Sequence, residues 1–409
     1  MSYHLSKRSP IIAIIGAGIG GLTLAIALRQ RGIQAAVYEQ AAELAEIGAA
    51  VALSANATRE LRRLGVLDGI AAASTEPSEL IYRDWGTGAR IAAHPVHQDL
   101  QYQQRFGAPF FGIHRADLQR VLSGTLGGEG LHLGHRLVDL ADQGDTIRLN
   151  FANGQVAEAD FVVGADGVRS VVRRWVTGGE GVRYSRTSAF RGIVPQEQLP
   201  TLPDRMAIQF WMGPDAHLLH YAIGGSGEHV NFFAVTEGPA AWPDPERWVI
   251  DAEPGEATAS FRGWHPAVTE MIGAGWVTKR WGLFVVDQPL RWHRGRVVIL
   301  GDAAHGMLPH HGQGANTTIE DVITLAELLP GATAHNWGER MASYLALRRV
   351  RTRKIQRSAW ATNAALHLPD GLALADRNAR VSRFPERFGW IHAHDALGAV
   401  RSRVSEQVA

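Results

Sequence analysis

A glycine-rich turn near the N-terminus lies between an apolar strand and a helical segment. The apolar run at residues 11–15 leads directly into Gly16-Ala17-Gly18-Ile19-Gly20-Gly21, and residues 22–31 have the composition of a helix. Residues 35–38 form a second strand-like segment, which ends at Glu39. This order of strand, glycine turn, helix and strand with a terminal acid predicts a βαβ unit that binds a dinucleotide.

Each glycine of this turn has a separate physical task in such a unit. Gly16 permits the tight turn, Gly18 lets the backbone approach a pyrophosphate, and Gly21 lets the helix pack closely on the strand. The helix N-terminus then faces the pyrophosphate, and Glu39 accepts hydrogen bonds from ribose hydroxyls. A glycine turn with a purely structural role is the alternative interpretation of the same residues.

Later segments of the chain indicate two kinds of sheet. Residues 161–167 and 296–302 also read as buried strands that end in a glycine turn. Between them, residues 187–237 contain strand-like segments separated by Gly, Pro and Asp, and residues 80–97 alternate as a hairpin does. We therefore predict an α/β fold with an inserted antiparallel sheet.

Helical patterns fill much of the remaining chain. A helix is expected to open at His114, and a helical piece lies near residues 257–272. A long arginine-rich helix reaches about Gln356, and short helices are expected after Pro369.

The composition excludes several classes of function. The chain has 409 residues, no cysteine and a formal net charge of +1. Without cysteine, thiol redox chemistry and cysteine-ligated metal sites are excluded, so any redox chemistry belongs to a cofactor. The near-neutral charge gives no broad attraction for nucleic acid or an anionic membrane, and no apolar stretch approaches the roughly 20 residues of a membrane helix. We expect a cytoplasmic monomer or homodimer with small-molecule partners and no metal.

A second glycine-rich loop lies far downstream, directly before a helix. It runs Gly312-Gln313-Gly314-Ala315-Asn316, and Thr317-Thr318-Ile319-Glu320 fits a capping box. The first backbone N–H groups of a helix lack partners within it and carry the positive end of its dipole. The loop therefore predicts an anion site, with an ordinary glycine turn as the alternative.

Three motifs in this order resemble the signatures of single-component FAD-dependent aromatic hydroxylases. They are the N-terminal glycine turn with Glu39, Gly164-Ala165-Asp166-Gly167-Val168-Arg169-Ser170, and Gly301-Asp302-Ala303-Ala304-His305. Their order and spacing match over nearly the whole chain. Further segments are similar to the branch of salicylate, 3-hydroxybenzoate and 6-hydroxynicotinate hydroxylases, namely Phe190-Arg191-Gly192, Asp287-Gln288-Pro289-Leu290 and Trp390-Ile391-His392.

The resemblance implies an FAD-binding Rossmann-like domain of the p-hydroxybenzoate hydroxylase type with an inserted antiparallel β-sheet substrate domain. FAD would lie extended, with its adenine on the βαβ unit and its isoalloxazine ring at the boundary with the inserted sheet. The expected parts are an FAD-binding domain at 1–78, 98–182 and 286–365, a substrate domain at 79–97 and 183–285, and a helical tail at 366–409.

The resemblance also implies positions around the cofactor. Arg115 would contact the ribityl or pyrophosphate region, the backbone of Leu137 or Val138 the adenine, and Asp302 a ribityl hydroxyl. For the charged side chains a structural ion pair is the alternative. NADH or NADPH would dock transiently as a co-substrate beside Asp166, because the chain has no second dinucleotide fingerprint. The expected FAD-binding residues are Gly16, Gly18, Ile19, Gly20, Gly21, Glu39, Gln40, Val51, Arg115, Leu137, Asp166, Asp302, Gly314, Ala315 and Asn316.

The implied reaction uses NAD(P)H and O₂ to hydroxylate a phenolic or heteroaromatic small molecule through a flavin C4a-hydroperoxide. A phenolate is a better electron donor than a phenol, and the pKa of a phenol such as tyrosine is about 10. A base that accepts the phenol proton therefore accelerates the step, typically by about 10²- to 10⁴-fold.

Histidines are the candidates for this base. On a strand His217 and Tyr221 share one face, and the resemblance matches them to a His and Tyr pair beside the substrate hydroxyl. His310 is the second candidate, because related hydroxylases place a substrate-contacting side chain there. His305 is expected to hold its loop together, and His311 departs from the Met or Gln-like residue of the family. A surface or core histidine remains the alternative for His217.

Further residues are candidates for substrate contact. Arg191 would pair with a substrate carboxylate or with the nicotinamide nucleotide, or would only brace the sheet. Apolar walls would shield the reactive flavin from water. The other candidates are Phe210, Phe232, Trp281 and Pro309.

Two other functions remain open at this point. One is a tailoring monooxygenase or epoxidase that acts on a larger natural product, and the other is a flavoprotein whose FAD is structural or sensory. A flavin-dependent halogenase is disfavoured, since the tryptophan-rich motif and catalytic lysine of that group are not evident.

Overall fold

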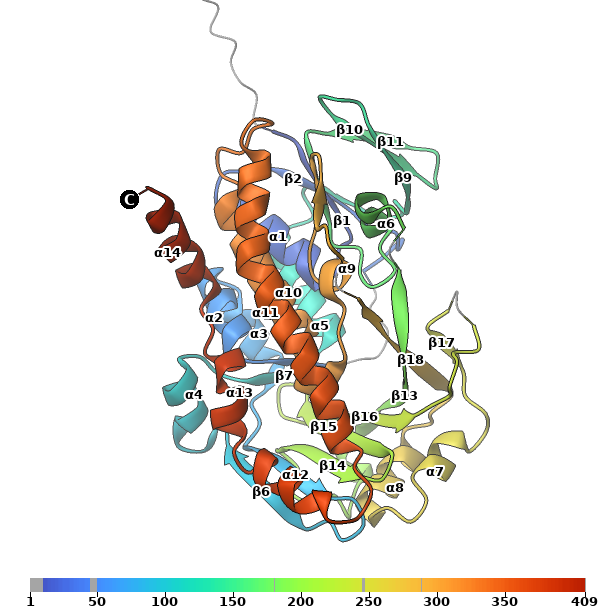
Figure 1. Cartoon of the computed structure of the whole chain (residues 1–409). Helices are drawn as coiled ribbons and strands as arrows, with labels where there is room; N and C mark the ends of the chain where they lie inside the picture. Colours follow the sequence, from blue (N-terminus) through green and yellow to red (C-terminus); the bar gives the residue numbers. More distant parts are fainter. Residues whose placement is uncertain (1–9, 45–49, 180, 245–246, 288, 409) are drawn as a thin grey trace, which may run out of the picture.

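The computed structural model of the chain describes residues 10–44, 50–179, 181–244, 247–287 and 289–408 (Figure 1). Gln288, part of one motif named above, lies outside the described residues. Figure 1 shows a sheet with β1 and β2 in the upper half and a second sheet with β13 to β16 in the lower half.

The upper sheet has six strands in the order β19-β20-β12-β1-β2-β8. All neighbours are parallel except β19 and β20. The central strands are buried along their whole length, as expected of continuous apolar runs covered on both faces. The strands are β1 (Ile12–Ile15), β2 (Ala35–Tyr38), β8 (Leu131–His132), β12 (Phe161–Gly164), β19 (His293–Arg294) and β20 (Val297–Ile299).

Helices pack on this upper sheet, and two small sheets pack against those helices. Helix α1 packs against α5 and α10, and α6 packs against β9 and β20. One small sheet has the order β11-β10-β9 and the other β3-β7-β4. The helices are α1 (Ile19–Arg29), α2 (Ala55–Arg63), α3 (Leu67–Ala72), α5 (Arg115–Leu126), α6 (Val171–Thr177), α9 (Asp302–His305) and α10 (Gly314–Leu328). The strands are β3 (Ala50–Leu53), β4 (Ser74–Thr75), β7 (Phe111–His114), β9 (Leu137–Asp142), β10 (Ile147–Phe151) and β11 (Val156–Ala159).

The lower sheet has eight strands in the order β17-β18-β13-β16-β15-β14-β5-β6. All its pairs are antiparallel except β5 with β14, and the hairpin expected within residues 80–97 is confirmed as β5 and β6. The strands are β5 (Glu79–Asp84), β6 (Arg90–Pro95), β13 (Val182–Pro195), β14 (Ile208–Gly213), β15 (Ala216–Ile223), β16 (His229–Glu237), β17 (Val249–Asp251) and β18 (Lys279–Val286).

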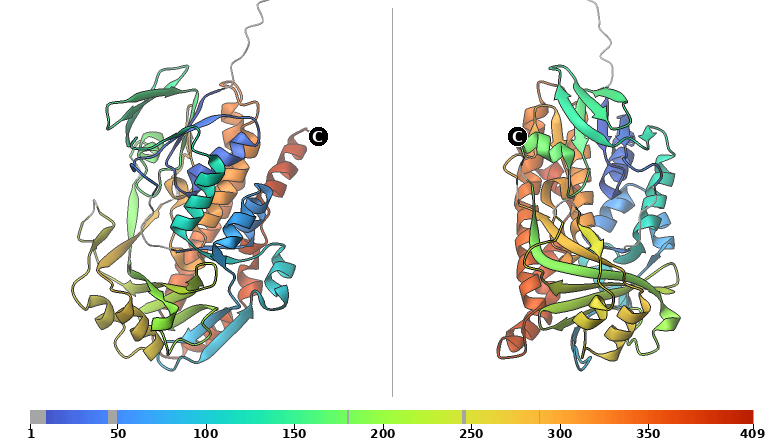
Figure 2. Two further views of the ribbon diagram at one scale, coloured as in Figure 1. Left: turned by 180° about the vertical axis from the view of Figure 1, so that it is seen from behind. Right: turned by 90° about the vertical axis from the view of Figure 1, so that its right-hand side faces the viewer.

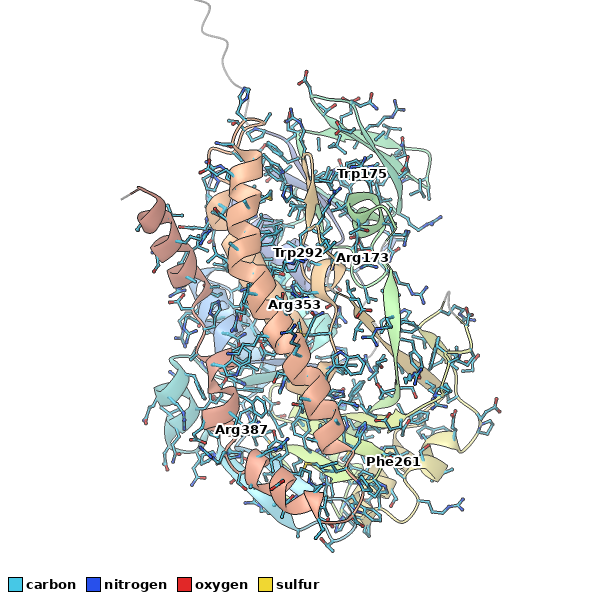
Figure 3. All side chains as sticks on the ribbon, viewed as in Figure 1. Arg173, Trp175, Phe261, Trp292, Arg353 and Arg387 are labelled. Atoms are coloured by element: carbon cyan, nitrogen blue, oxygen red, sulfur yellow. The ribbon has the colours of Figure 1, made fainter. Side chains whose placement is uncertain are left out.

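Two short helices close one face of the lower sheet (Figure 2). Phe261, labelled in Figure 3, packs with Phe190 and Phe232 of the sheet in one hydrophobic core. The prediction of a single helical piece near residues 257–272 is wrong, because two helices are present there. The chain forms α7 (Glu256–Ser260) and α8 (Pro266–Ala274), because Pro266 fits the start of a new helix but not the interior of an old one.

The C-terminal part links the two sheets. Helix α11 (Trp337–Leu366) runs from the upper layer to the lower sheet in Figure 1, and it continues ten residues past the expected end at Gln356. Short helices after Pro369 are confirmed, and they lie along the side of the molecule. They are α12 (Ala373–Val381), α13 (Phe384–His392) and α14 (Ala396–Val408), and α4 (Gln101–Phe106) lies near α13. Among the described helices none is both long and apolar enough to cross a membrane.

Candidate active site

The carboxyl ends of three parallel strands meet at the main cavity. The loops after β1, β12 and β20 carry Gly16, Asp166 and Asp302, and all three residues line one cavity of about 830 Å³. Because adjacent parallel strands end at the same edge of a sheet, motifs far apart in sequence lie side by side there.

The N-terminal glycines have the geometry that a dinucleotide turn requires. Gly16 has φ +103°, and a β-carbon there would lie 2.5 Å from the carbonyl oxygen of Ala165. A β-carbon on Gly21 would overlap the carbonyl oxygen of Gly16, so this glycine permits the close packing of α1 on the turn. A β-carbon on Gly18 would meet no protein atom within 4 Å, and Gly18 lines the cavity. The backbone at Gly18 is therefore open to a ligand.

Glu39 lies at the end of β2 and reaches back to the turn. Its carboxylate accepts hydrogen bonds from the backbone N–H of Ala17 at 2.8 Å and of Ala41 at 2.9 Å. These bonds fix the carboxylate at the cavity wall, which leaves acceptor capacity for ligand hydroxyls because a carboxylate has about four lone-pair positions.

Hydrogen bonds fix Asp166 within the segment after β12 and connect that segment to the helix that begins at Asp302. Asp166 accepts hydrogen bonds from the Ser170 hydroxyl at 2.5 Å and from the backbone N–H of Val171 at 2.8 Å, while burial raises its pKa. The buried Arg173 guanidinium donates to the carbonyl oxygens of Val168 at 2.7 Å and Ala303 at 3.2 Å (Figure 3). Arg173 therefore ties the loop after β12 to the helix that begins at Asp302.

The start of α10 faces the same cavity, but its cap differs from the expected one. The helix begins at Gly314, and the capping box at Thr317 to Glu320 is wrong. Thr317 lies inside the first turn and its hydroxyl donates to the carbonyl oxygen of Gln313 at 2.7 Å. Glu320 instead forms buried ion pairs with Arg348 and Arg351 of α11. Gly314 and Ala315 line the cavity, so the first unpaired N–H groups of this 15-residue helix face it.

Most residues expected to bind FAD line this cavity. Two do not: Gly21 packs on Gly16, and Asn316 is buried with its side chain bonded to Ser54, Ala52 and Gly312. The expected residues that line the cavity are Gly16, Gly18, Ile19, Gly20, Glu39, Gln40, Val51, Arg115, Leu137, Asp166, Asp302, Gly314 and Ala315. An extended dinucleotide fits this lining, because the glycines let the backbone approach the ligand, the helix N-termini offer N–H groups to its phosphates, and the carboxylates can accept hydrogen bonds from its hydroxyls.

A smaller cavity of about 200 Å³ adjoins the first. Ala52, Leu219, Tyr221 and Gly312 line both cavities, so the two share a wall. Aromatic side chains and histidines from the lower sheet, α4, α13 and the segments around Phe110 and His310 surround it. They are Tyr82, His94, Tyr102, Phe106, Phe110, Phe210, Tyr221, His310, His311, Phe384 and His392.

The three catalytic candidates lie together, but in two layers. Tyr221 and His310 line the smaller cavity, whereas His217 is not among the residues that line either cavity. The ring centroid of His217 lies 5.0 Å from that of His310, edge to face. Burial is the main cause that lowers the pKa of both histidines well below the ordinary value, so both rings are neutral at neutral pH.

The neighbouring histidines of the motif have structural partners. His305 is fully buried, and its Nε2 lies 2.5 Å from the Asp321 carboxylate, which confirms that it holds its loop together. His311 Nε2 lies 2.9 Å from the Ser358 hydroxyl of α11, and its ring lines the smaller cavity. Burial lowers the pKa of His311 to about 4.

Arg191 lies in the wall of the larger cavity. Its guanidinium is 4.7 Å from the ring centroids of both Phe233 and Trp281, and its pKa is lowered to about 10 by burial and by the nearby Arg115. Of the other residues expected to contact substrate, Phe232, Trp281 and Pro309 line the larger cavity and Phe210 lines the smaller one.

Several residues of the site carry no sequence signal that singles them out. Tyr82 comes from β5, and Tyr102 from α4 donates or accepts a 2.6 Å hydrogen bond with Nδ1 of His392. Trp248, just before β17, lines the larger cavity. Of these four residues, His392 alone lies in a segment marked by the family resemblance, Trp390-Ile391-His392.

The comparisons with known proteins agree with this geometry. The model of the FAD binding domain family matches residues 9–359. The chain is 38% identical over 390 residues to 3-amino-4-hydroxybenzoate 2-monooxygenase of Streptomyces cremeus, and the matched region covers 94% of this chain and 95% of the relative. It is 34% identical over 354 residues to 6-hydroxynicotinate 3-monooxygenase of Pseudomonas fluorescens, covering 86% of this chain and 90% of the relative.

A solved structure also has this fold. The substrate complex of a salicylate hydroxylase superposes with a TM-score of 0.82 at 26% identity, covering 97% of this chain and 98% of the other. The resemblance drawn from the three sequence motifs is thereby confirmed, as is the p-hydroxybenzoate hydroxylase type of fold. The chain belongs to the family of FAD-dependent aromatic monooxygenases, and FAD is its cofactor.

Proposed function

We propose that the enzyme hydroxylates a single-ring phenolic or hydroxypyridine acid that binds in the smaller cavity. The observation that carries this proposal is the wall that the two cavities share at Tyr221 and Leu219. A ring in the smaller cavity lies directly beside the larger one, on the side of the inserted sheet. The volume of about 200 Å³ favours one ring over a large natural product.

The relatives named above point to the same class of substrate. Their names specify 3-amino-4-hydroxybenzoate and 6-hydroxynicotinate, each of which has one ring with a hydroxyl and a carboxylate. The aromatic side chains around the smaller cavity suit such a ring, because offset and edge-to-face contacts stabilise aromatic pairs by about 0.5–1.5 kcal/mol.

In this proposal the larger cavity holds FAD through the residues that line it. The open backbone at Gly18 and the start of α1 would receive the pyrophosphate, and Glu39 the adenosine ribose. Asp302 would bind the ribityl chain, and the start of α10 at Gly314 would stabilise negative charge on the flavin. Bound FAD supplies electron transfer from NAD(P)H to O₂, with the nicotinamide nucleotide as a transient co-substrate.

The proton chemistry belongs to residues at the shared wall. Tyr221 and His310 would contact the substrate hydroxyl, and His217 behind them would accept the proton. Both histidines are neutral at neutral pH and are therefore able to act as bases. Removal of the proton makes the ring a stronger electron donor, which typically accelerates such a step by about 10²- to 10⁴-fold.

Arg191 would serve the nicotinamide nucleotide rather than the substrate. It lies in the larger cavity between two aromatic rings, and it does not line the smaller one. A buried cation with aromatic neighbours suits an anionic or planar part of NAD(P)H.

The test is a screen of NADH and NADPH oxidation with 3-amino-4-hydroxybenzoate, 6-hydroxynicotinate and larger indoles or quinolones. The proposal predicts that a single-ring hydroxy acid stimulates oxidation and gains one oxygen, as mass spectrometry of the product would show. Stimulation by the larger compounds alone would support a tailoring enzyme instead. A yellow protein that no nicotinamide nucleotide reduces would support a structural or sensory FAD.

The assignment of the base has its own test. His217→Ala should lower the hydroxylation rate with the true substrate and change its pH dependence, while the NAD(P)H-dependent reduction of FAD stays near that of the wild type. A full hydroxylation rate across the pH range would show that His217 is not the base.

A further inference from the structure

A chain of hydrogen bonds leads from the buried His217 to the surface. Nδ1 of His217 in β15 lies 2.6 Å from Nε2 of His367, which caps the C-terminus of α11. Nδ1 of His367 lies 2.6 Å from Oε1 of Glu237 at the end of β16. His217 is 1% exposed and His367 5%, whereas the Glu237 side chain is 43% exposed. Three side chains from three elements thus connect the interior with solvent.

The carboxylate at the outer end sets the direction of every hydrogen bond. An ionised carboxylate only accepts hydrogen bonds, so Nδ1 of His367 carries the proton that is donated to Glu237. In neutral His367 the other nitrogen, Nε2, is then unprotonated and accepts from Nδ1–H of His217. Neutral His217 therefore keeps its lone pair on Nε2. The pairing with Glu237 prepares the buried histidine to accept a proton.

The inner end of the chain borders the proposed substrate cavity. His217 contacts His310 edge to face, and its ring is inclined by 27° to that of Phe210 at a centroid distance of 6.4 Å. Both His310 and Phe210 line the smaller cavity. Leu219 and Tyr221, on the same face of β15 as His217, line both cavities.

Few other titratable groups face this chain. His310 lies next to His217, and the pKa of His310 is lowered by burial and by the neighbouring His367 and His311. At the outer end, the Asn363 amide of α11 donates to Glu237 at 3.4 Å. Burial and, to a smaller extent, the negative charge of Glu237 raise the pKa of Tyr184 in β13. The hydrogen bond from His367 is the main cause that lowers the pKa of Glu237.

We propose that Glu237 and His367 relay a proton between His217 and solvent during each catalytic cycle. This inference rests on the proposed function, because it requires that the substrate hydroxyl ionises in the smaller cavity. It assigns to His367 and Glu237, which no sequence motif marks, the role of relay residues behind the base.

The relay balances in protons and bonds. The substrate proton forms a bond to one ring nitrogen of His310, which lines the smaller cavity, and the proton on the other ring nitrogen of His310 moves to Nε2 of His217. The proton on Nδ1 of His217 then moves to Nε2 of His367. The proton on Nδ1 of His367 moves to Glu237, which releases it to water. Each broken N–H bond is matched by a new bond to hydrogen. The same steps in reverse return a proton to the hydroxylated product and restore the original tautomers of His310, His217 and His367, so no ring has to rotate.

A purely structural role is the competing explanation. The contact also fastens the end of α11 to the lower sheet, since the carbonyl oxygen of His367 accepts from the backbone N–H of Asp215 at 3.1 Å. The backbone N–H of Glu237 in turn donates to the carbonyl oxygen of Asp215 at 2.9 Å. A test must therefore measure proton movement itself and not only activity.

The first experiment uses the FAD-loaded enzyme with 3-amino-4-hydroxybenzoate and 6-hydroxynicotinate as probes. A pH-indicator dye follows proton release after rapid mixing, and absorbance follows the phenolate. His367→Gln and Glu237→Gln keep polar side chains of similar size. Tyr184→Phe is the matched control, because Tyr184 lies near Glu237, donates its hydrogen bond to the carbonyl oxygen of Gly238 and lines neither cavity. We expect proton release to slow by about 10-fold or more in the two relay variants and to stay unchanged in the control. FAD reduction by NAD(P)H should keep its rate in all three.

The second measurement needs no substrate. Nitrogen NMR of ¹⁵N-histidine-labelled holoenzyme should find the proton of His217 on Nδ1 and that of His367 on Nδ1. A proton on Nε2 of His217 would overturn the relay, as would hydroxylation with unchanged proton release and pH profile in His367→Gln. If neither probe is hydroxylated, the proposed substrate class fails, and the tautomer of His217 still decides the inference.

Discussion

At the scale of single residues, Gly21 and Gly124 show when a missing β-carbon matters. Both lie in helices, Gly21 in α1 and Gly124 in α5. A β-carbon on Gly21 would overlap the carbonyl oxygen of Gly16, whereas one on Gly124 would meet no atom within 4 Å. The first glycine is required by packing, and the second only adds conformational freedom to the unfolded chain.

The two alanine variants should therefore differ in sign. Gly21→Ala should lower the free energy of unfolding by about 1–3 kcal/mol or more and weaken FAD binding, because α1 has to move away from the turn. Gly124→Ala should raise the free energy of unfolding by about 0.5–1 kcal/mol. Urea unfolding and fluorescence titration with FAD measure both effects, and a similar effect of the two substitutions would contradict this account of the turn.

At the scale of elements, a buried ion cluster joins α10 to α11. Arg348 of α11 pairs with Glu320 and Asp321 of α10, in each case at 2.7 Å, and all three side chains are at most 1% exposed. Asp321 also accepts a hydrogen bond from the backbone N–H of Gly301 at 2.9 Å. The cluster therefore fixes the loop that presents Asp302 to the cofactor cavity.

Removal of the central cation tests this arrangement. Arg348→Leu removes the cation shared by two buried carboxylates and leaves Glu320 with Arg351 alone and Asp321 with His305, so we expect a loss of about 3–5 kcal/mol in the free energy of unfolding and weaker FAD binding. Arg183→Ala, which removes an exposed pair with Asp287, is the control and should change neither quantity appreciably. Wild-type stability and FAD affinity in Arg348→Leu would show that the cluster does not hold the loop.

Elements were predictable from the sequence where local pattern decides them. The apolar runs with their glycine turns predicted β1, β12 and β20, and the alternation within residues 80–97 predicted β5 and β6. The capping box at Thr317–Glu320 failed because Glu320 pairs with arginines about thirty residues away. Spacing along the chain carries no information on such a partner.

At the scale of the whole molecule, the two cavities differ in how much the sequence reveals. Most of the residues expected to bind FAD do line the larger cavity, because they belong to local motifs, whereas other parts of its lining such as Trp248 carry no such signal. The smaller cavity is assembled from β5, α4, β14, β15 and α13, which lie far apart in sequence. Tyr82, Tyr102 and His367 therefore had no recognisable signal, and the position of His217 one layer behind His310 depends on the packing of α11.

The many buried histidines should make the folded enzyme sensitive to acid. Burial lowers the pKa of His220 to about 3, and neither of its ring nitrogens has a hydrogen-bond partner within the described residues. Because an unfolded histidine has a pKa of about 6.5, the unfolded state binds more protons below that pH. The stability contribution of neutral His220 is complete above about pH 6.5 and is lost as the pH falls toward 3. His217, His310, His311 and His392 act in the same sense.

Urea unfolding of the holoenzyme at pH 7 and pH 5 measures this effect. The loss of stability between the two pH values should be smaller by about 2 kcal/mol in His220→Leu than in the wild type. His335→Gln, a substitution at an exposed histidine, should leave the loss unchanged. An equal pH dependence in wild type and His220→Leu would show that His220 is already protonated or exposed in the folded state.

The central claim is that this FAD enzyme inserts one atom of molecular oxygen into a small aromatic ring bound beside Tyr221. The most direct test is turnover of the stimulating hydroxy acid with NAD(P)H under ¹⁸O₂, followed by mass spectrometry of the product. The account predicts one ¹⁸O atom per product molecule and a marked loss of that product in Tyr221→Phe. Oxidation of NAD(P)H that yields only hydrogen peroxide with every ring compound, or product oxygen derived from water, would contradict it.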